Sequence, residues 1–179
     1  MRGLLVGRYQ PFHSGHLGVV RRIRAGAPDE ELILAIGSAE QSYTWENPFT
    51  ASERFEMIVR ALSEARLDRV VVLPVPDIHR HALWVRYLEG LLPAFERVYT
   101  YNPLTRLLFE KAGYPVESPP LIDRGRFEGK KIRALLAAGR PLGTRVPPSV
   151  AEYLAQIDAP GRLRMLRGGP ARRPEARRS

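Results

Sequence analysis

Hydrophobic and polar positions along the chain alternate between short apolar runs and longer stretches with helical spacing. The apolar runs predict four buried strands and then a short extended piece, at residues 3–7, 31–37, 69–75, 97–101 and 116–119. Apolar residues spaced three and four apart predict helices between and after these strands, at residues 14–25, 51–65, 82–92, 103–112, 130–138 and 148–157. Strands that alternate with helices favour an α/β fold, in which a parallel, Rossmann-like sheet carries helices on both faces.

The helix at residues 51–65 has the clearest boundary signal. Residues 50–53 read TASE, a capping-box pattern in which the Thr50 hydroxyl caps the helix and the Glu53 carboxylate reaches back. The spacing of the apolar positions predicts a buried face on this helix. Its predicted inward residues are Phe55, Ile58, Val59 and Leu62.

Length and composition fit a single globular domain. The chain has 179 residues, 44% of them hydrophobic, and is long enough to bury a core without disulfides or metal ions. It contains no cysteine, which excludes a disulfide scaffold, thiolate catalysis and cysteine-ligated metal sites. No apolar run approaches the roughly 18 residues of a membrane span, and residues 1–7 are too short for a signal-peptide core. We therefore expect a cytoplasmic protein that does not enter a membrane.

The net charge of +9 is concentrated toward the C-terminus. Residues 160–179 contain seven arginines and one acidic residue, and so carry +6 of this charge. The rest of the chain is only weakly basic, which argues against nucleic acid as a partner. Glycine, proline, alanine and arginine dominate from Gly168 onward, so we expect a folded domain at residues 1–167 and a disordered tail at residues 168–179. Such a tail is either solvated or in contact with a polyanion.

The most distinctive segment is GRYQPFHSGH at residues 7–16, between the first strand and the first helix. Ligands of open α/β sheets bind beyond the carboxyl ends of the strands, and a helix N-terminus there offers free N–H groups to an anion. His13 and His16 project from one turn, and Gly15 lets a ligand approach the backbone. This combination suits a polyphosphate, whose oxygens accept hydrogen bonds from imidazole. Two other interpretations stay open: half of a zinc site, for which no third ligand is evident, and a helix cap with incidental histidines.

The HxGH signature in this segment resembles that of the nucleotidylyltransferase superfamily. Over residues 1–167 the chain is similar to the archaeal type of nicotinamide mononucleotide adenylyltransferase. Besides residues 7–16, the similarity rests on IGSAEQS (36–42), NPFTASER (47–54), PVPDI (74–78), ALW (82–84), NPL (102–104) and GKKIR (129–133). The resemblance implies a sheet of the nucleotidylyltransferase type. It also implies an enzyme that transfers AMP from ATP to nicotinamide mononucleotide, giving NAD and pyrophosphate by direct in-line attack.

The resemblance assigns roles on the ATP side of the site to the first motif. His16 would stabilise the transition state, and His13 would contact the ATP phosphates. Arg8 and Gly15 would bind phosphate as well. Asn102 would lie near the adenosine ribose, while the plainer interpretation of its Asn-Pro pair is a turn.

A second phosphate motif is implied at residues 129–133, which open a helix. Its family form is rich in serine and threonine and ends in an arginine, here Arg133. This chain departs from that form with Glu128, Gly129 and Lys130. Lys130 could replace the hydrogen bond of a hydroxyl with a point charge on phosphate. The alternatives are a weakened site and a solvated basic helix start.

The acceptor side is implied by three further residues. Trp84 would stack on the nicotinamide ring, because an electron-rich indole face suits a flat cation; an ordinary core tryptophan is the alternative. Asp77 and Ser38 would orient the same substrate. The chain departs from the family at His81, where asparagine is usual, and at Glu46, where some relatives carry arginine.

The resemblance also implies partners and a cofactor. Mg²⁺ would travel with ATP and need few protein ligands, so no residue is assigned as a metal ligand. A homo-oligomer, a hexamer in the family, is implied. Two other functions stay open. One is a related adenylyl- or cytidylyltransferase that uses another phosphorylated acceptor, such as flavin mononucleotide or phosphopantetheine. The other is a non-catalytic relative that binds a nucleotide or nucleic acid.

Overall fold

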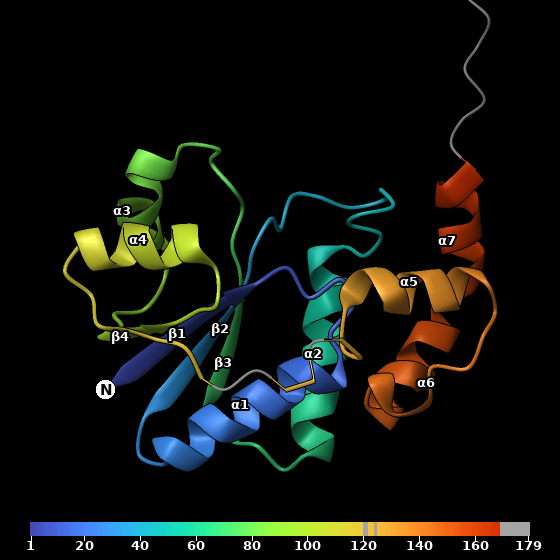
Figure 1. The fold of residues 1–179 in the computed structure, drawn as a ribbon, viewed down its shortest axis with the longest axis horizontal. Helices are drawn as coiled ribbons and strands as arrows, with labels where there is room; N and C mark the ends of the chain where they lie inside the picture. The colour runs from blue at the N-terminus through green and yellow to red at the C-terminus, as the bar shows by residue number, and fades with distance from the viewer. Residues whose placement is uncertain (120–121, 124, 169–179) are drawn as a thin grey trace, which may run out of the picture.

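Five parallel strands form the sheet at the centre of the computed structural model (Figure 1). The structure describes residues 1–119, 122–123 and 125–168. The strand order is β3-β2-β1-β4-β5, with β1 in the middle. The strands are β1 (Arg2–Gly7), β2 (Glu31–Ile36), β3 (Val70–Pro74), β4 (Arg97–Tyr99) and β5 (Val116–Glu117). Parallel strands need crossover connections, and here helices supply them.

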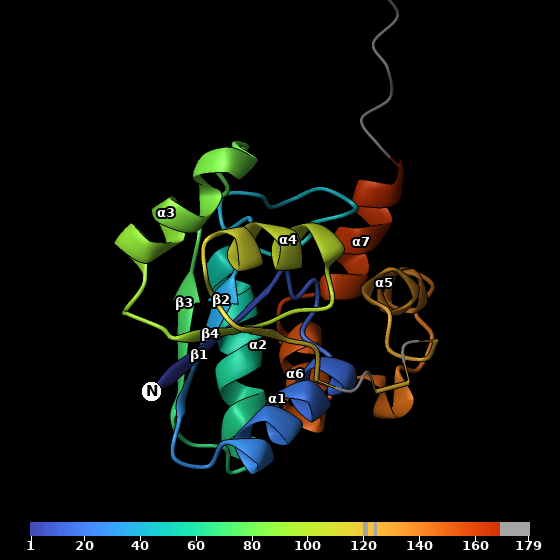
Figure 2. The same cartoon turned by 60° about the vertical axis from the view of Figure 1, so that its left-hand side comes forward.

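Helices cover both faces of this sheet, as the alternating pattern predicts (Figures 1 and 2). One face packs against α1 (Ser14–Gly26) and α2 (Ala51–Glu64), and the other against α3 (His81–Leu91) and α4 (Pro103–Lys111). Successive residues of a strand point to opposite faces. Accordingly Leu5 and Leu34 belong to the first core cluster, whereas Leu4, Ile33 and Ala35 belong to the second. The α/β fold class is confirmed.

The C-terminal part of the described chain extends the layer of α1 and α2. It consists of α5 (Gly129–Ala137), a 3₁₀ turn at Gly143–Arg145, α6 (Pro148–Gln156) and α7 (Ala159–Gly168). The hydrophobic pattern predicts α5 and α6 but not α7, because Pro160 and Gly161 stand in its first turn. Proline is tolerated there, and Asp158 accepts a hydrogen bond from the Gly161 N–H through its carboxylate.

The capping box of α2 is confirmed, but part of its predicted buried face is wrong. The Glu53 N–H donates to the Thr50 hydroxyl at 3.2 Å, and the Thr50 N–H donates to the Glu53 carboxylate at 2.9 Å. Phe55 and Val59 are 40% and 38% exposed. The buried residues are Arg54, Met57, Ile58, Ala61 and Leu62. The buried face of α2 therefore includes an arginine. A prediction based on apolar positions alone leaves that residue out and so misplaces the face.

The structure limits what can be said of the predicted tail. Gly168 is the last residue of α7, and the domain boundary predicted at residue 167 stays a prediction. Residues 169–179 of the predicted tail lie outside the described residues. Within the described ranges, no helix is both long and apolar enough to cross a membrane.

Candidate active site

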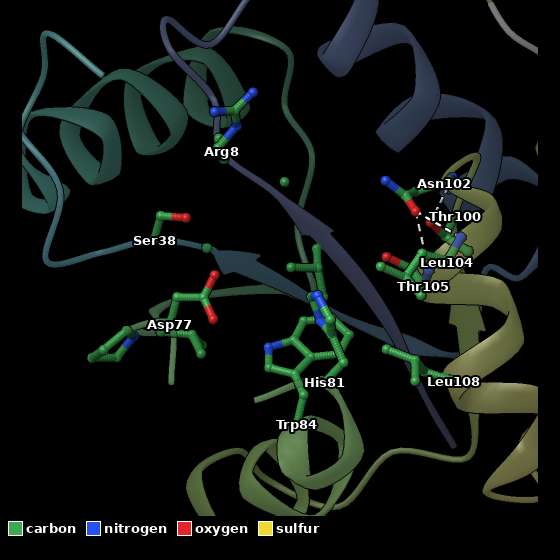
Figure 3. Close-up of a pocket in the computed structure, with 15 residues that line it drawn as sticks. Arg8, Ser38, Asp77, His81, Trp84, Thr100, Asn102, Leu104, Thr105 and Leu108 are labelled. Carbon is green, nitrogen blue, oxygen red and sulfur yellow. Dashed lines mark hydrogen bonds between the residues drawn. The ribbon is translucent and has the colours of Figure 1, made fainter. Parts of the chain in front are cut away.

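A pocket lies at the carboxyl ends of β1, β2, β3 and β4, where open α/β sheets bind their ligands. Its volume is about 360 Å³, within the roughly 300–1,000 Å³ of small-molecule sites. Five residues predicted for the site line it together: Arg8, Ser38, Asp77, Trp84 and Asn102. Figure 3 shows Asp77 and Trp84 on one side of this pocket and Asn102 on the other. We call it the strand-end pocket.

Trp84 belongs both to the strand-end pocket and to the core beneath it. Its ring meets Phe109 edge-on, with centroids 5.6 Å apart at 69°. It packs against the core cluster under α3 and α4 while remaining part of the pocket lining. The core therefore holds the indole in place as a wall of the pocket. Packing in the core is confirmed for part of the ring, and stacking on a ligand stays a prediction.

Asp77 is held by groups from the loops around it. Its backbone N–H donates to the Glu40 carboxylate at 2.9 Å, and its own Oδ1 accepts the His79 N–H at 2.9 Å. The His79 ring lies 3.9 Å from the Asp77 carboxylate. This side of the pocket, which His81 also lines, thus combines acidic and imidazole groups.

Asn102 caps α4 and faces the pocket at the same time. Its side-chain oxygen accepts the N–H groups of Leu104 and Thr105 at 2.9 and 3.1 Å. Figure 3 shows the amide nitrogen on the pocket side. The side-chain oxygen is therefore engaged in the helix cap, and the amide nitrogen is the group that can donate to a ligand.

A second cavity of about 330 Å³ adjoins the strand-end pocket. The two cavities share Val6, Gly7, Thr100 and Asn102. The second, which we call the histidine cavity, contains His16 and Tyr101. Two ligands could therefore lie on either side of the end of β1, one against Trp84 and the other against His16.

His13 and His16 cap α1 reciprocally. The His16 N–H donates to Nδ1 of His13, and the His13 N–H donates to Nδ1 of His16, both at 3.3 Å. The two rings stack with centroids 3.5 Å apart. Because each Nδ1 accepts a hydrogen bond, the proton of each neutral imidazole is on Nε2. Each ring therefore carries its donor on Nε2. Of the two, His16 lines the histidine cavity, and His13 lines neither cavity among the described residues.

Both imidazoles are neutral at pH 7. Burial lowers the pKa of His13 to about 4, since a low dielectric disfavours the charged form. Burial, and then the charge of His13, lower the pKa of His16 well below its usual value. The predicted helix cap is thus present. The same hydrogen bonds leave Nε2 of each neutral ring as the donor.

Gly15 has a packing role between the two histidines. A Cβ there would come 2.7 Å from Cβ of Phe127 and 3.1 Å from Nδ1 of His13. In the part of the chain that the structure describes, Gly15 lines neither the strand-end pocket nor the histidine cavity. The lack of a side chain at Gly15 makes room for Phe127 and the His13 imidazole, and its predicted contact with phosphate stays a prediction.

Arg133 is buried beside the first motif. Its guanidinium donates to the Gln10 carbonyl at 2.7 Å, and its Nε has no partner among the described residues. Burial and then the charge of Arg8 lower its pKa, which Glu46 and Glu128 oppose. The two guanidinium groups, of Arg8 and Arg133, repel each other. An anion bound near both would relieve that repulsion.

The N-terminus of α5 lies against the same segment. A Cβ on Gly129 would meet the Gln10 carbonyl at 3.1 Å and the Arg133 guanidinium at 3.3 Å. Glycine therefore allows the helix start to approach the first motif. The Glu128 side chain makes no capping hydrogen bond, so the first N–H groups of α5 are not capped by that residue.

Lys130 lies apart from both cavities. It is exposed and lines a separate surface groove with Trp45 and Arg167. Lys131 donates to the Gly125 carbonyl at 2.9 Å and lies 3.3 Å from the Glu128 carboxylate. The structure thus separates the two lysines, as their helical spacing predicts, but places Lys130 beside Trp45.

Thr100 and Arg54 are among the residues at the site that were not predicted from the sequence. Thr100 lines both cavities, and its hydroxyl accepts the Asn102 N–H at 3.1 Å. Its position at the end of a predicted strand was the available signal. Arg54 donates to backbone carbonyls of the loops that form the strand-end pocket. Its place one turn before Ile58 on the buried face of α2 was the corresponding signal.

Comparison with known proteins gives consistent matches. The cytidylyltransferase-like family matches residues 4–128. The chain is 44% identical over 165 residues to a nicotinamide-nucleotide adenylyltransferase of Thermoplasma acidophilum, covering 92% of this chain and 91% of that one. It is 45% identical over 168 residues to a protein of the same name from Methanosphaerula palustris, covering 93% and 98%.

A solved structure matches the fold. It is a bifunctional NMN adenylyltransferase/ADP ribose pyrophosphatase from Francisella tularensis, in complex with AMP and a manganese ion. The TM-score is 0.73 at 20% sequence identity. The match covers 92% of this chain but only 51% of the other, so this chain spans about half the length of that protein.

Proposed function

The chain belongs to the cytidylyltransferase-like family, among relatives named nicotinamide-nucleotide adenylyltransferase, and from this we propose that it adenylylates nicotinamide mononucleotide. AMP passes from ATP to the mononucleotide, which gives NAD and pyrophosphate. The observation that carries the proposal is the pair of adjoining cavities. They meet at Gly7, with Trp84 in one and His16 in the other.

The chemistry is a direct displacement. A 5′-phosphate oxygen of the mononucleotide attacks the α-phosphorus of ATP, and the bond from that phosphorus to the β-phosphate oxygen breaks. Pyrophosphate leaves with the electron pair. The attacking phosphate is already anionic, so the protein need supply neither a nucleophile nor a strong base. Catalysis is then positioning together with stabilisation of charge.

The histidine cavity and its surroundings take ATP in this proposal. His16 donates from Nε2 to the oxygens of the α-phosphoryl group as charge shifts in the transition state. His13 donates to the ATP phosphates from the same cap. Arg8, which lines the strand-end pocket, and Arg133, which is bonded to the first motif, also bind phosphate. The N–H groups at the start of α5, which the Glu128 side chain does not cap, add donors with a favourable helix dipole.

The strand-end pocket takes the acceptor. Trp84 stacks on the nicotinamide ring, with its indole held by Phe109. Asp77, fixed by Glu40, and Ser38 orient the nucleotide. Asn102 stands on the wall that both cavities share and donates to the adenosine ribose from its amide nitrogen.

The proposal gives ATP as its Mg²⁺ complex. Among the described residues, no group of three or more histidine, aspartate or glutamate side chains could hold a metal ion. Magnesium bound to substrate phosphates keeps several of its own waters and needs few protein ligands. The proposal also includes a cytoplasmic location and a homo-oligomeric assembly, the latter to be measured by analytical ultracentrifugation.

A panel of acceptors tests the proposal. The protein is incubated with ATP and Mg²⁺ together with nicotinamide mononucleotide, flavin mononucleotide or phosphopantetheine, and pyrophosphate release is measured for each. We expect release only, or far fastest, with the pyridine nucleotide. Preference for another acceptor would assign the chain to a related transferase. Release with none of them, together with binding to nucleic acid, would support the non-catalytic alternative.

A further inference from the structure

Arg54 is the largest fully buried side chain in the described part of the protein, with none of its surface exposed. It projects from the first turn of α2. Across residues 1–119, 122–123 and 125–168 it makes no ion pair with a carboxylate, unlike Arg60 on the same helix. A buried cation normally needs such a partner or several hydrogen bonds, so its partners must explain why it is there.

Backbone carbonyls are those partners. One terminal nitrogen of Arg54 donates to the Arg8 carbonyl at 3.0 Å and to the Gly37 carbonyl at 2.9 Å. The other terminal nitrogen donates to the Ser38 carbonyl at 3.1 Å. Nε donates to Thr50 at the helix cap at 3.2 Å. A single planar group therefore joins the loop after β1 to the loop after β2.

The loops that Arg54 joins have strained backbones. Tyr9 and Ser38 have φ angles of 50° and 48°, in the left-handed region that residues with a side chain rarely adopt. Arg54 binds the carbonyl on the N-terminal side of Tyr9 and the carbonyl of Ser38 itself. Such conformations persist where the surroundings hold them, and here the guanidinium supplies hydrogen bonds that do so.

The same two loops carry side chains of the strand-end pocket. Arg8 and Ser38 both line it (Figure 3). In the proposed function, on which this inference rests, Arg8 binds phosphate and Ser38 contacts the acceptor. The distance between these two side chains helps set where the attacking phosphate lies relative to the α-phosphorus of ATP.

We propose that Arg54 is a positioning residue of the transfer reaction. It locks the loop after β1 against the loop after β2, so that Arg8 and Ser38 hold the two substrates in line. The role depends on a rigid fork with several donors, which lysine does not have. Arg54 touches neither substrate and acts through these two residues.

The buried charge is compatible with this role. Burial and then the charge of Arg8 lower the pKa of Arg54 to about 10, against the influence of Glu40. The guanidinium is therefore still protonated at neutral pH and keeps all its donors. Because it is bonded to the loops that carry Arg8 and Ser38, its charge also adds positive potential where phosphates are expected to bind.

Steady-state kinetics of Arg54→Lys test the proposal, with Arg60→Lys on the same helix as the matched control. We expect Arg54→Lys to lower kcat by roughly 10- to 100-fold, the scale of a small misalignment of reacting groups. The Arg60 variant should stay near wild type. Wild-type kcat in a folded Arg54→Lys protein would overturn the proposal.

Double-mutant cycles separate positioning from a general loss of structure. In the Arg54→Lys background, Arg8→Ala and Ser38→Ala should lower kcat by a smaller factor than they do in the wild-type background, because the alignment of the Arg8 and Ser38 side chains is already lost. Trp84→Ala, in the same pocket but on α3, should lower kcat by the same factor in both backgrounds. Equal costs for all three variants in both backgrounds would show that Arg54 does not act through the two loops.

Two controls complete the test. NAD formation by the wild-type protein reports on the proposed function, so its failure is distinguishable from a failure of the Arg54 variants. If Arg54→Lys does not fold, as judged by its melting transition, Arg54→Gln is used in the same cycles. If neither variant folds, Arg54 serves the fold alone and the proposal is wrong.

Discussion

At the scale of single residues, His13 and His16 show how a local cap prepares a side chain for chemistry. Each ring accepts the backbone N–H of the other residue through Nδ1, and burial keeps both rings neutral. The remaining nitrogen then carries the proton. The position of a donor is thereby set by backbone geometry before any ligand binds, which is the preorganisation that catalysis by hydrogen bonding requires.

The depressed pKa of His13 predicts a pH dependence of stability. The unfolded chain takes up a proton near pH 6.5, whereas the folded protein does so near pH 4. As pH falls through this window, protonation favours the unfolded state, and about 3 kcal/mol of stability is lost by pH 4. His13→Asn keeps an acceptor at the cap and removes this titration. Denaturant unfolding at pH 7 and pH 4 should show a smaller loss for the variant, and equal losses would contradict the assignment.

Trp84 predicts a selective effect on the acceptor. Trp84→Ala should weaken binding of the mononucleotide by about 1–3 kcal/mol, the range for stacking of a base on an aromatic side chain, with little change in the binding of ATP. Calorimetric titration of each substrate measures this. Trp45→Ala is the control, since Trp45 lies in the groove with Lys130 and not in the strand-end pocket. Equal losses for both substrates, with a lower melting temperature, would assign Trp84 to the core alone.

Three residues of the strand-end pocket could be predicted because they follow predicted strands. The rule that ligands bind at carboxyl ends and the family resemblance both point to Arg8, Ser38 and Asp77. Arg54 could not be found in this way, because its contacts are to carbonyls of distant loops. The environment of Lys130 also depends on Trp45, far away along the chain, and spacing along one helix does not define it.

At the scale of elements, α5 meets the first motif through glycine and arginine. Gly129 lets the helix start approach the Gln10 carbonyl, and Arg133 donates to that same carbonyl. The altered sequence of the second motif therefore retains close packing and a buried cation. What differs is Lys130, which projects into the neighbouring groove.

Lys130 and Lys131 form a matched pair on this helix. Because Lys130 lies outside both cavities, only the long-range attraction of its charge for phosphate remains, so Lys130→Ala should raise the KM for ATP by no more than about two- to fivefold, and the effect should shrink as salt rises. Lys131→Ala should change it less, because Lys131 is engaged with Glu128 and Gly125. Kinetics at low and high salt measure both. Wild-type ATP dependence in both variants would leave Arg133 and backbone N–H groups as the phosphate contacts of α5.

The helix α7 marks the limit of pattern-based prediction of the fold. Strands and the other α-helices appear in the sequence as apolar periodicities, with boundaries within two residues of those observed. In α7, arginines and a Pro-Gly pair obscure that periodicity. Arg162 nevertheless reaches Glu53 with both terminal nitrogens, at 2.6 and 2.7 Å. A long-range pair of this kind stabilises a helix without any local signal in the sequence.

At the scale of the whole molecule, the order of the strands brings the separate motifs together. With β1 in the centre, the loops after β2 and β4 lie on either side of the loop after β1. The strand-end pocket and the histidine cavity therefore share one wall. In the proposed reaction, this arrangement aligns a mononucleotide phosphate with the α-phosphorus of ATP beside His16.

This alignment is tested by a time course of NAD and pyrophosphate formation from ATP, Mg²⁺ and nicotinamide mononucleotide, with wild type and His16→Ala side by side. We predict that the wild type forms both products in equal amounts. A folded His16→Ala protein should form them about 10²-fold more slowly, the scale of one lost transition-state donor. Absence of both products with the wild type, or wild-type rates with the variant, would contradict the account.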